Sequence, residues 1–191
     1  MKNLIIKDIQ DSVQVKQEML KTHIELIEQA ATLTYECVKA GHKVLFFGNG
    51  GSAGDSQHLA AELVGRYEKE RRGIPSIALT TDTSILTAVG NDYGFDRIFE
   101  RQIEALGNHG DIAFGISTSG NSINVLLGIS KAKALGMVTI GLSGRDGGKL
   151  KSAVDLSIVV PSNKTARIQE SHIMIGHIIC ERVEELWVTS R

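Results

Sequence analysis

The sequence predicts an α/β protein, a three-layer α/β/α sandwich with a five-stranded parallel sheet and an N-terminal helical arm. Two observations support this. Short apolar runs of strand length recur through residues 44–160, and helical stretches separate them. Continuous apolar strands that alternate with helices are typical of a parallel sheet covered on both faces. The long segment before the first run has helical periodicity instead.

That first segment, residues 4–40, contains neither glycine nor proline, and its apolar residues recur at helical spacing. It is one long helix or two consecutive helices, and Gly41 ends it, as glycine commonly does just past a last helical turn. Such an arm is longer than a small sheet needs for cover. We therefore expect a single domain, residues 1–191, in which residues 1–40 are an arm for oligomer packing and residues 41–191 are the α/β/α core.

The apolar runs are the expected strands, and a largely apolar helix from about residue 165 to residue 187 should be substantially buried. The strands are VLFFG (44–48), SIALT (76–80), IAFGI (112–116), MVTIGL (137–142) and LSIVV (156–160).

Composition excludes several classes of protein. Of 191 residues, 42% are hydrophobic and 23% charged, which is typical of a folded globular protein, and the net charge of −1 gives no electrostatic reason to expect nucleic acid. No run approaches the roughly 20 apolar residues of a membrane-spanning helix. Cys37 and Cys180 are isolated, and the N-terminal residues lack a signal-peptide pattern, so we expect a cytoplasmic location.

Two polar loops follow predicted strands. Residues 49–52 (NGGS) follow the first, and residues 117–122 (STSGNS) follow the third. In open parallel sheets, ligands bind outside the carboxyl ends of the strands. Hydroxyl groups and the N–H groups of a helix that begins near Asn121 can hold a phosphate without a basic side chain. The alternative is that these residues only form turns and cap helices. Two such loops at one edge favour a small phosphate-bearing ligand.

Candidate ligating residues lie on two helices. His58 and Glu62 are four apart and share a helix face shortly after the NGGS loop, and Gln169 and His177 share a face of the last helix. Two imidazoles, a carboxylate and an amide oxygen are compatible with zinc or another divalent cation. The alternatives are an exposed helical pair and satisfied core histidines, and His172 competes with His177 for the functional role.

Five segments are similar to one known family in sequence, order and spacing: GNGGSAGDSQHLAAELVGRY, GNDYGFDRIF, GDIAFGISTSGNSINV, GLSGRDGGKL and ARIQESHIMIGHIICE. They resemble the sedoheptulose 7-phosphate isomerases (phosphoheptose isomerases) of the sugar-isomerase, or SIS, domain group, over nearly the whole chain. The resemblance implies conversion of sedoheptulose 7-phosphate into D-glycero-D-manno-heptose 7-phosphate, the entry step of bacterial heptose synthesis for surface glycans such as lipopolysaccharide. It also implies a homotetramer with shared active sites and one zinc ion per subunit.

The resemblance further implies residue roles. Glu62 and His177 match the proton-transfer pair, and the implied metal ligands are His58, Glu62, Gln169 and His177. The implied substrate-binding residues are Asn49, Gly50, Gly51, Ser52, Glu62, Asn91, Asp92, Ser117, Thr118, Ser119, Ser122 and Gln169. One departure is Ala166, because some members have an aspartate there.

Two other functions of SIS-domain proteins are alternatives to the enzyme. Non-catalytic tetramers of the same group bind the bacterial replication initiator, but they lack the acid and the histidine that correspond to Glu62 and His177, and they carry a basic residue in the loop that holds Ser119 here. A phosphosugar-sensing regulatory domain would come attached to a further module, for which 191 residues leave no room. We therefore expect the enzyme. The sequence leaves open whether Arg66 or Arg97 reaches a neighbouring pocket.

Overall fold

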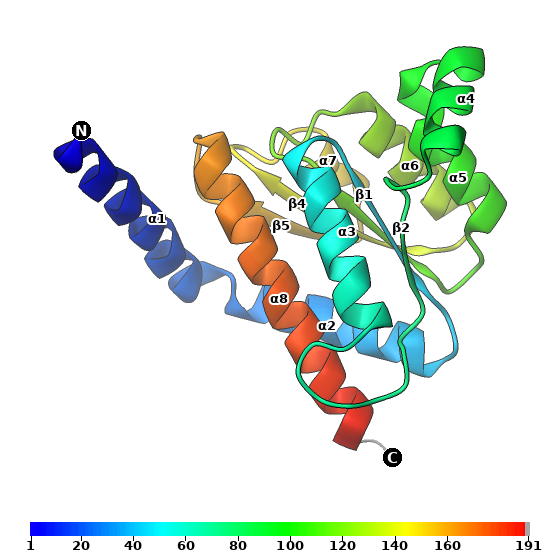
Figure 1. The fold of residues 1–191 in the computed structure, drawn as a ribbon, viewed down its shortest axis with the longest axis horizontal. Helices are drawn as coiled ribbons and strands as arrows, with labels where there is room; N and C mark the ends of the chain where they lie inside the picture. Colours follow the sequence, from blue (N-terminus) through cyan, green and yellow to red (C-terminus); the bar gives the residue numbers. More distant parts are fainter. Residues whose placement is uncertain (190–191) are drawn as a thin grey trace.

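The computed structural model describes residues 1–189, which form three layers around one parallel sheet (Figure 1). The sheet has five strands in the order β2-β1-β3-β4-β5, and every neighbouring pair is parallel. This confirms the predicted fold class. The strands are β1 (Val44–Gly48), β2 (Ser76–Ala78), β3 (Ile112–Ile116), β4 (Val138–Gly144) and β5 (Leu156–Val160).

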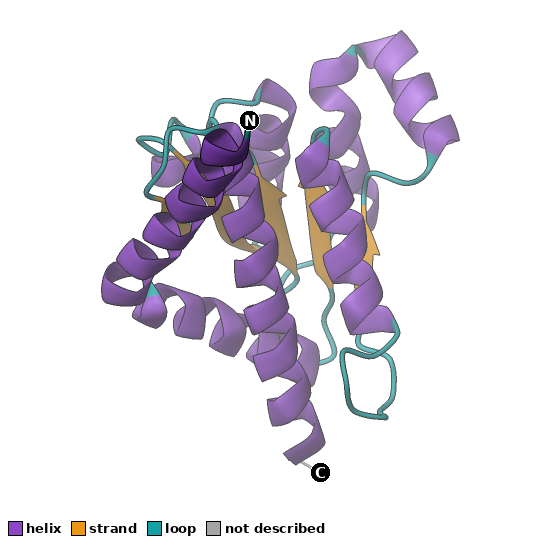
Figure 2. Cartoon of the chain, turned by 60° about the vertical axis from the view of Figure 1, so that its left-hand side comes forward, coloured by secondary structure: helices purple, strands orange, loops and turns teal. Residues whose placement is uncertain are grey.

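Alternate residues of β1 and β3 contribute to two separate cores, because successive side chains of a strand point to opposite faces. On β1, Val44 and Phe46 belong to one apolar cluster, whereas Leu45 and Phe47 belong to the other. Figure 2 shows helices on both sides of the sheet. The first face is covered by α2 (Ile24–Lys39), α3 (Gly51–Val64) and α8 (Thr165–Thr189), and the second by α5 (Ile98–Leu106), α6 (Ile123–Ala134) and α7 (Leu150–Ala153).

The N-terminal arm is two helices, α1 (Lys2–Thr22) and α2, and the chain changes direction at His23. The His23 ring is buried and its Nε2 donates a hydrogen bond to the Val159 carbonyl oxygen, at 2.8 Å. Helix α1 projects away from the sheet (Figure 1) and leaves a row of large apolar residues exposed. These are Leu4, Ile5, Ile6, Ile9, Val13 and Leu20.

Two strands end at residues other than those expected from the sequence. The edge strand β2 ends at Ala78 rather than at Thr80, since it has only β1 to pair with and its register with β1 ends at Phe46. Strand β4 extends to Gly144, because β5 pairs with it from Ile140 to Gly144. Helix α4 (Thr83–Tyr93) and the short 3-10 helix η1 (Phe95–Arg97) lie beyond β2. No helix within residues 1–189 is long and apolar enough to cross a bilayer.

Candidate functional site

The first loop owes its shape to glycine. A Cβ on Gly48 would lie 2.7 Å from the Ile116 carbonyl oxygen, so β1 and β3 approach closely where both loops begin. Gly50 has a φ of 57°, a left-handed value that favours glycine. The N–H of Ser52 donates to the Asn49 carbonyl oxygen at 3.0 Å, which closes the turn into α3. The loop therefore places its backbone at the carboxyl edge of the sheet.

The second loop joins β3 to α6. Its Ser117 and Ser122 hydroxyl groups are 2.9 Å apart, and the Asn121 N–H donates to Ser119 Oγ at 3.2 Å. Ser122 occupies the N-cap position of α6, but its hydroxyl is turned toward Ser117 rather than toward the helix. The first N–H groups of α6, which no helical carbonyl can satisfy, are left directed at the loop. Hydroxyl groups and these N–H groups thus lie together where the sequence analysis expects a phosphate, and donors of both kinds are suited to an anion.

An amide pair that the sequence analysis missed joins the two loops. Asn49 and Asn124 exchange hydrogen bonds of 2.8 and 2.9 Å between their side chains, and Asn124 is only 3% exposed. β1 and β3 are neighbours in the sheet, so the residues that follow them meet. A buried asparagine in the first turn of an otherwise apolar helix was the available signal.

Three of the four predicted metal ligands converge where α3 lies beside α8 (Figure 1). His58 Nε2 is 3.0 Å from Glu62 Oε1 and 3.0 Å from His177 Nε2. One ligand atom from each of these residues lies within 4.8 Å of the others. The close helix approach depends on Gly176, because a Cβ there would overlap the Leu59 side chain. We call His58, Glu62 and His177 the trio.

The fourth predicted ligand, Gln169, lies toward the first loop. A Cβ on Gly51 would overlap its side-chain amide, so the amide rests on the backbone of that loop. Gln169 is eight residues before His177, which corresponds to about 12 Å along the helix axis. In this structure the Gln169 side chain lies against the first loop, on the same helix as His177.

His172, the competing histidine, is a core residue. Its side chain is buried, and Nε2 donates to the Ser143 carbonyl oxygen of β4 at 3.0 Å. Burial lowers the pKa of His172 to about 4, although the hydrogen bond to Ser143 acts in the opposite direction. The ring is neutral at pH 7 and faces the sheet. His177, on another face of α8, lies beside His58 and Glu62 of α3.

Asp55 is a further acidic group near the trio that sequence reasoning did not identify. It lies one helical turn before His58 on α3 and is half-buried. Burial raises the pKa of its carboxyl to about 6, and the neighbouring His58 opposes part of that rise. Its place one turn before His58 was the available signal.

The remaining predicted residues lie elsewhere on the single chain. Asn91 and Asp92 are exposed on α4, where Asn91 Nδ2 donates to Asp92 Oδ1 at 2.8 Å, and α4 packs against η1 and α5. The Arg66 and Arg97 side chains are also exposed; Arg66 donates to the Glu68 carbonyl oxygen, and Arg97 pairs with Glu100. Ala166 is exposed at the start of α8.

The trio is chemically suited to a divalent metal. Two imidazole nitrogens and one carboxylate oxygen are the donor set of many catalytic zinc sites, which keep a further position for water or substrate. Ligand atoms about 2.0–2.2 Å from a tetrahedral metal lie roughly 3.3 Å from one another, close to the two 3.0 Å separations observed. The residues present therefore fit zinc.

The fold and the site define a sugar-isomerase type of protein, and the SIS domain family model matches residues 9–144. The phosphoheptose isomerase of Aliarcobacter butzleri is 54% identical over 184 residues, covering 96% of this chain and 97% of that protein. That of Aquifex aeolicus is 56% identical over 180 residues, covering 94% of each chain. The chain belongs to the phosphoheptose isomerase family of SIS-domain proteins.

Solved structures agree with this assignment. The phosphoheptose isomerase of Neisseria gonorrhoeae superposes with a TM-score of 0.92 at 44% identity, covering 96% of this chain and 98% of that one. The corresponding structure from Francisella tularensis gives a TM-score of 0.93 at 40% identity, covering 96% and 97%. The N-terminal helices are included in these matches, because the coverage is nearly complete.

Proposed function

We propose that the chain converts sedoheptulose 7-phosphate into D-glycero-D-manno-heptose 7-phosphate, the first step of bacterial heptose synthesis. The observation that carries the proposal is the convergence of Glu62 and His177, from α3 and α8, in a member of the phosphoheptose isomerase family. A carboxylate and an imidazole at one point are the groups that a ketose–aldose isomerisation through an enediolate requires.

In this mechanism Glu62 is the base that removes a proton from C1 of the open-chain ketose, and it returns a proton to C2. The electron pair of the C1–H bond forms the C1–C2 double bond of the enediolate, and the carbonyl oxygen at C2 takes up the negative charge. His177 moves the proton between O1 and O2. General acid–base groups of this kind typically contribute 10²–10⁴-fold to a rate.

The second loop would anchor the far end of the sugar. Ser117, Thr118, Ser119 and Ser122 would bind the phosphate with the N–H groups of α6. Asn49, Gly50, Gly51 and Ser52 of the first loop, together with Gln169, would contact the sugar. Anchoring the phosphate away from the trio lets binding energy from the unreactive end of the substrate orient the reactive carbons.

One zinc ion per subunit is the proposed cofactor. His58, Glu62 and His177 would hold it, with Gln169 as the fourth candidate ligand. When bound, zinc supplies positive charge that polarises a carbonyl and stabilises a developing oxyanion. A carboxylate that coordinates a metal is a weaker base. Metal coordination by Glu62 and proton removal by Glu62 therefore compete with each other.

We further propose a cytoplasmic homotetramer with shared active sites, and no nucleic-acid or membrane partner. Supporting observations are the exposed apolar row on α1 and a groove of about 460 Å³ between α2 and α8 that includes Ile24, Ile27 and Ile178. Asn91 and Asp92 complete a pocket in this proposal by reaching a neighbouring subunit. Light scattering on the purified protein tests the assembly, and a monomer at micromolar concentration contradicts it.

The rival function, a tetramer that binds the replication initiator without catalysis, is not favoured. That role has no need of an acid and an imidazole at one point, whereas Glu62 and His177 meet beside His58. The family assignment points the same way. The distinguishing experiment is turnover of sedoheptulose 7-phosphate.

Replacing Glu62 by glutamine tests the proposed base. Glu62→Gln keeps the size of the side chain and its place on α3, so we expect a folded protein that still binds substrate but has lost about 10³-fold or more in kcat. Purified variant and parent are incubated with sedoheptulose 7-phosphate, with and without a chelator, and the aldose product is measured. Glu36→Gln, an exposed change on α2, is the matched control. A near-native rate for Glu62→Gln removes Glu62 from the base role.

A further inference from the structure

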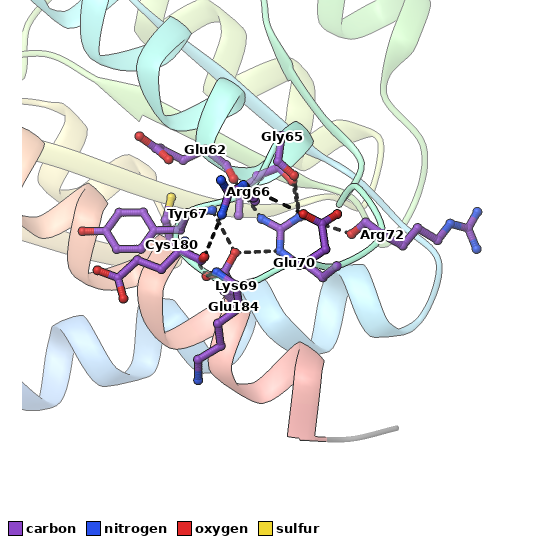
Figure 3. Close-up of polar contacts among 12 residues, drawn as sticks. Glu62, Gly65, Arg66, Tyr67, Lys69, Glu70, Arg72, Cys180 and Glu184 are labelled. Carbon is purple, nitrogen blue, oxygen red and sulfur yellow. Dashed lines mark hydrogen bonds and ion pairs between the residues drawn. The ribbon is translucent and has the colours of Figure 1, made fainter.

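A buried glutamate on α8 binds the loop that follows α3. Glu184 is 2% exposed, and its carboxylate accepts hydrogen bonds from three successive backbone N–H groups: Tyr67 at 2.8 Å, Glu68 at 2.7 Å and Lys69 at 2.8 Å (Figure 3). Three charge-assisted bonds from one carboxylate fix the backbone of a segment that has no regular secondary structure. Glu184 therefore holds the first residues of this loop against α8.

Arg71 connects the same carboxylate to the end of α3. Its side chain is 2% exposed, and Nε donates to Glu184 Oε1 at 3.0 Å. The terminal nitrogens donate to the carbonyl oxygens of Glu62 at 2.8 Å and of Leu63 at 2.9 Å. The last carbonyls of a helix have no partner within the helix, and a cation there is favoured by the helix dipole. One guanidinium thus binds both the helix end and the carboxylate on α8.

Electrostatics keep the pair ionised. Burial raises the pKa of Glu184, but the three backbone donors and Arg71 outweigh it and hold that pKa below the usual glutamate value. A buried ion pair adds little stability compared with a well-packed apolar replacement, because both charges lose their water. What this pair does provide is a defined geometry, since each partner has several fixed contacts.

The residues so fixed are next to the proposed chemistry. Glu62 offers its side chain to the trio while its carbonyl oxygen is held by Arg71. His177 is seven residues before Glu184, so the two share one face of α8 about two turns apart. Tyr67, whose N–H is bound by Glu184, has its ring centroid 6.0 Å from that of His177. The contacts of Glu184 and Arg71 therefore connect the end of α3, which carries the acid, to α8, which carries the imidazole.

We propose that Glu184 and Arg71 are positioning residues that hold Glu62, together with His58 on α3, at its working distance from His177 on α8. The expected effect on kcat rests on the proposed isomerase function, whereas the expected effect on the geometry of the trio does not. Misplacement of a reacting group by about 1 Å can cost on the order of 10²-fold in rate. The proposed phosphate contacts and most of the proposed sugar contacts lie on the two loops rather than on the loop that Glu184 binds, so substrate binding should change little.

The test uses Glu184→Gln with Asp111→Asn as a matched control. Asp111 is also a buried carboxylate, and it accepts bonds from the Lys43 and Asn108 N–H groups and from Lys43 Nζ. Both changes replace one carboxylate oxygen, which accepts hydrogen bonds, by an amide NH2 group, which cannot accept them. We expect both to lower the melting temperature, but only Glu184→Gln to lower kcat, by about ten- to a hundredfold with KM changed less than about threefold. Equal kcat values in the two variants overturn the proposal.

A second pair of variants separates charge from geometry. Arg71→Lys keeps the positive charge but loses the planar set of donors that reaches two carbonyls at once. We expect a kcat loss of about tenfold, whereas Arg72→Lys, at the exposed neighbouring position, leaves kcat within about twofold. An unchanged kcat for Arg71→Lys contradicts the positioning role of Arg71.

A crystal structure of Glu184→Gln provides the readout that does not depend on activity. The His58 Nε2 to His177 Nε2 distance, which spans α3 and α8, is 3.0 Å here, and we expect it to exceed hydrogen-bonding range in the variant. If the parent protein does not convert sedoheptulose 7-phosphate, the proposed function fails and this distance alone decides the positioning role. An unchanged distance overturns that role whatever the activity.

Discussion

Two histidines five residues apart on α8 have opposite surroundings. His177 lies beside His58 and Glu62 at a surface where two helices meet. His172 is buried against β4, and its Nε2 donates to the Ser143 carbonyl oxygen. Five residues rotate a helix position by about 140°, so one face of α8 covers the sheet while another meets α3. The comparison shows that on a largely apolar helix the neighbouring element, rather than residue type, decides what a histidine does.

The largest effect that tests this comparison concerns turnover. His177→Gln removes the group proposed to move the proton between the substrate oxygens, and we expect kcat to fall by about 10²–10⁴-fold. His172→Gln removes a core histidine that faces the sheet, so kcat per folded molecule should stay within about threefold of the parent. Initial rates with sedoheptulose 7-phosphate measure both. Comparable losses in the two variants would break the distinction between the two faces.

The next effect is a dependence of stability on pH. The pKa of His172 is about 4 in the folded protein, against 6.5 as its ordinary value, because burial disfavours the charged ring. As pH falls, the unfolded chain therefore takes up a proton before the folded one. The stability that the neutral ring provides is complete above pH 6.5 and is lost progressively toward pH 4, by up to about 3 kcal/mol.

Denaturant unfolding between pH 4.5 and pH 8 at fixed protein concentration measures this dependence. We expect the His172→Gln variant to lose less stability than the parent over that range, because glutamine does not titrate there. His177→Gln serves as the control, since His177 is only half-buried and makes no comparable contact with the sheet. Parallel pH curves for the parent and His172→Gln would contradict a buried neutral His172.

Much of this arrangement could be predicted from the sequence. The strands were identified because each apolar run is continuous and bounded by helical stretches, and the two loops because polar residues follow β1 and β3 directly. The spacing of His58 and Glu62 fixed a shared helix face. Local sequence patterns do not indicate which side chains of distant segments contact each other. Asn49 with Asn124, 75 residues apart, and Arg71 with Glu184, 113 residues apart, required the fold.

The same limit explains what remained ambiguous. Helix α8 is apolar on much of its circumference, because it packs against the sheet, α2 and α3 together. No periodicity could then separate His172 from His177. The sequence allowed two consecutive helices in the arm but did not place the break at His23, since no glycine or proline marks it and the His23 ring contacts Val159 of the distant β5. Asn91 and Asp92 remain predictions, as the single chain leaves them exposed on α4.

The smallest effect isolates the hydrogen bond of the buried histidine. Glutamine at position 172 can place an amide nitrogen near the former Nε2 and donate to the Ser143 carbonyl oxygen, whereas leucine cannot. We therefore expect His172→Leu to be less stable than His172→Gln by about 1 kcal/mol at pH 8, where protonation plays no part. Thermal unfolding should show this as a melting temperature lower by about 2–4 °C. If leucine is the more stable replacement, apolar packing on the sheet-facing side of α8 outweighs the hydrogen bond, and His172 is tolerated there rather than required.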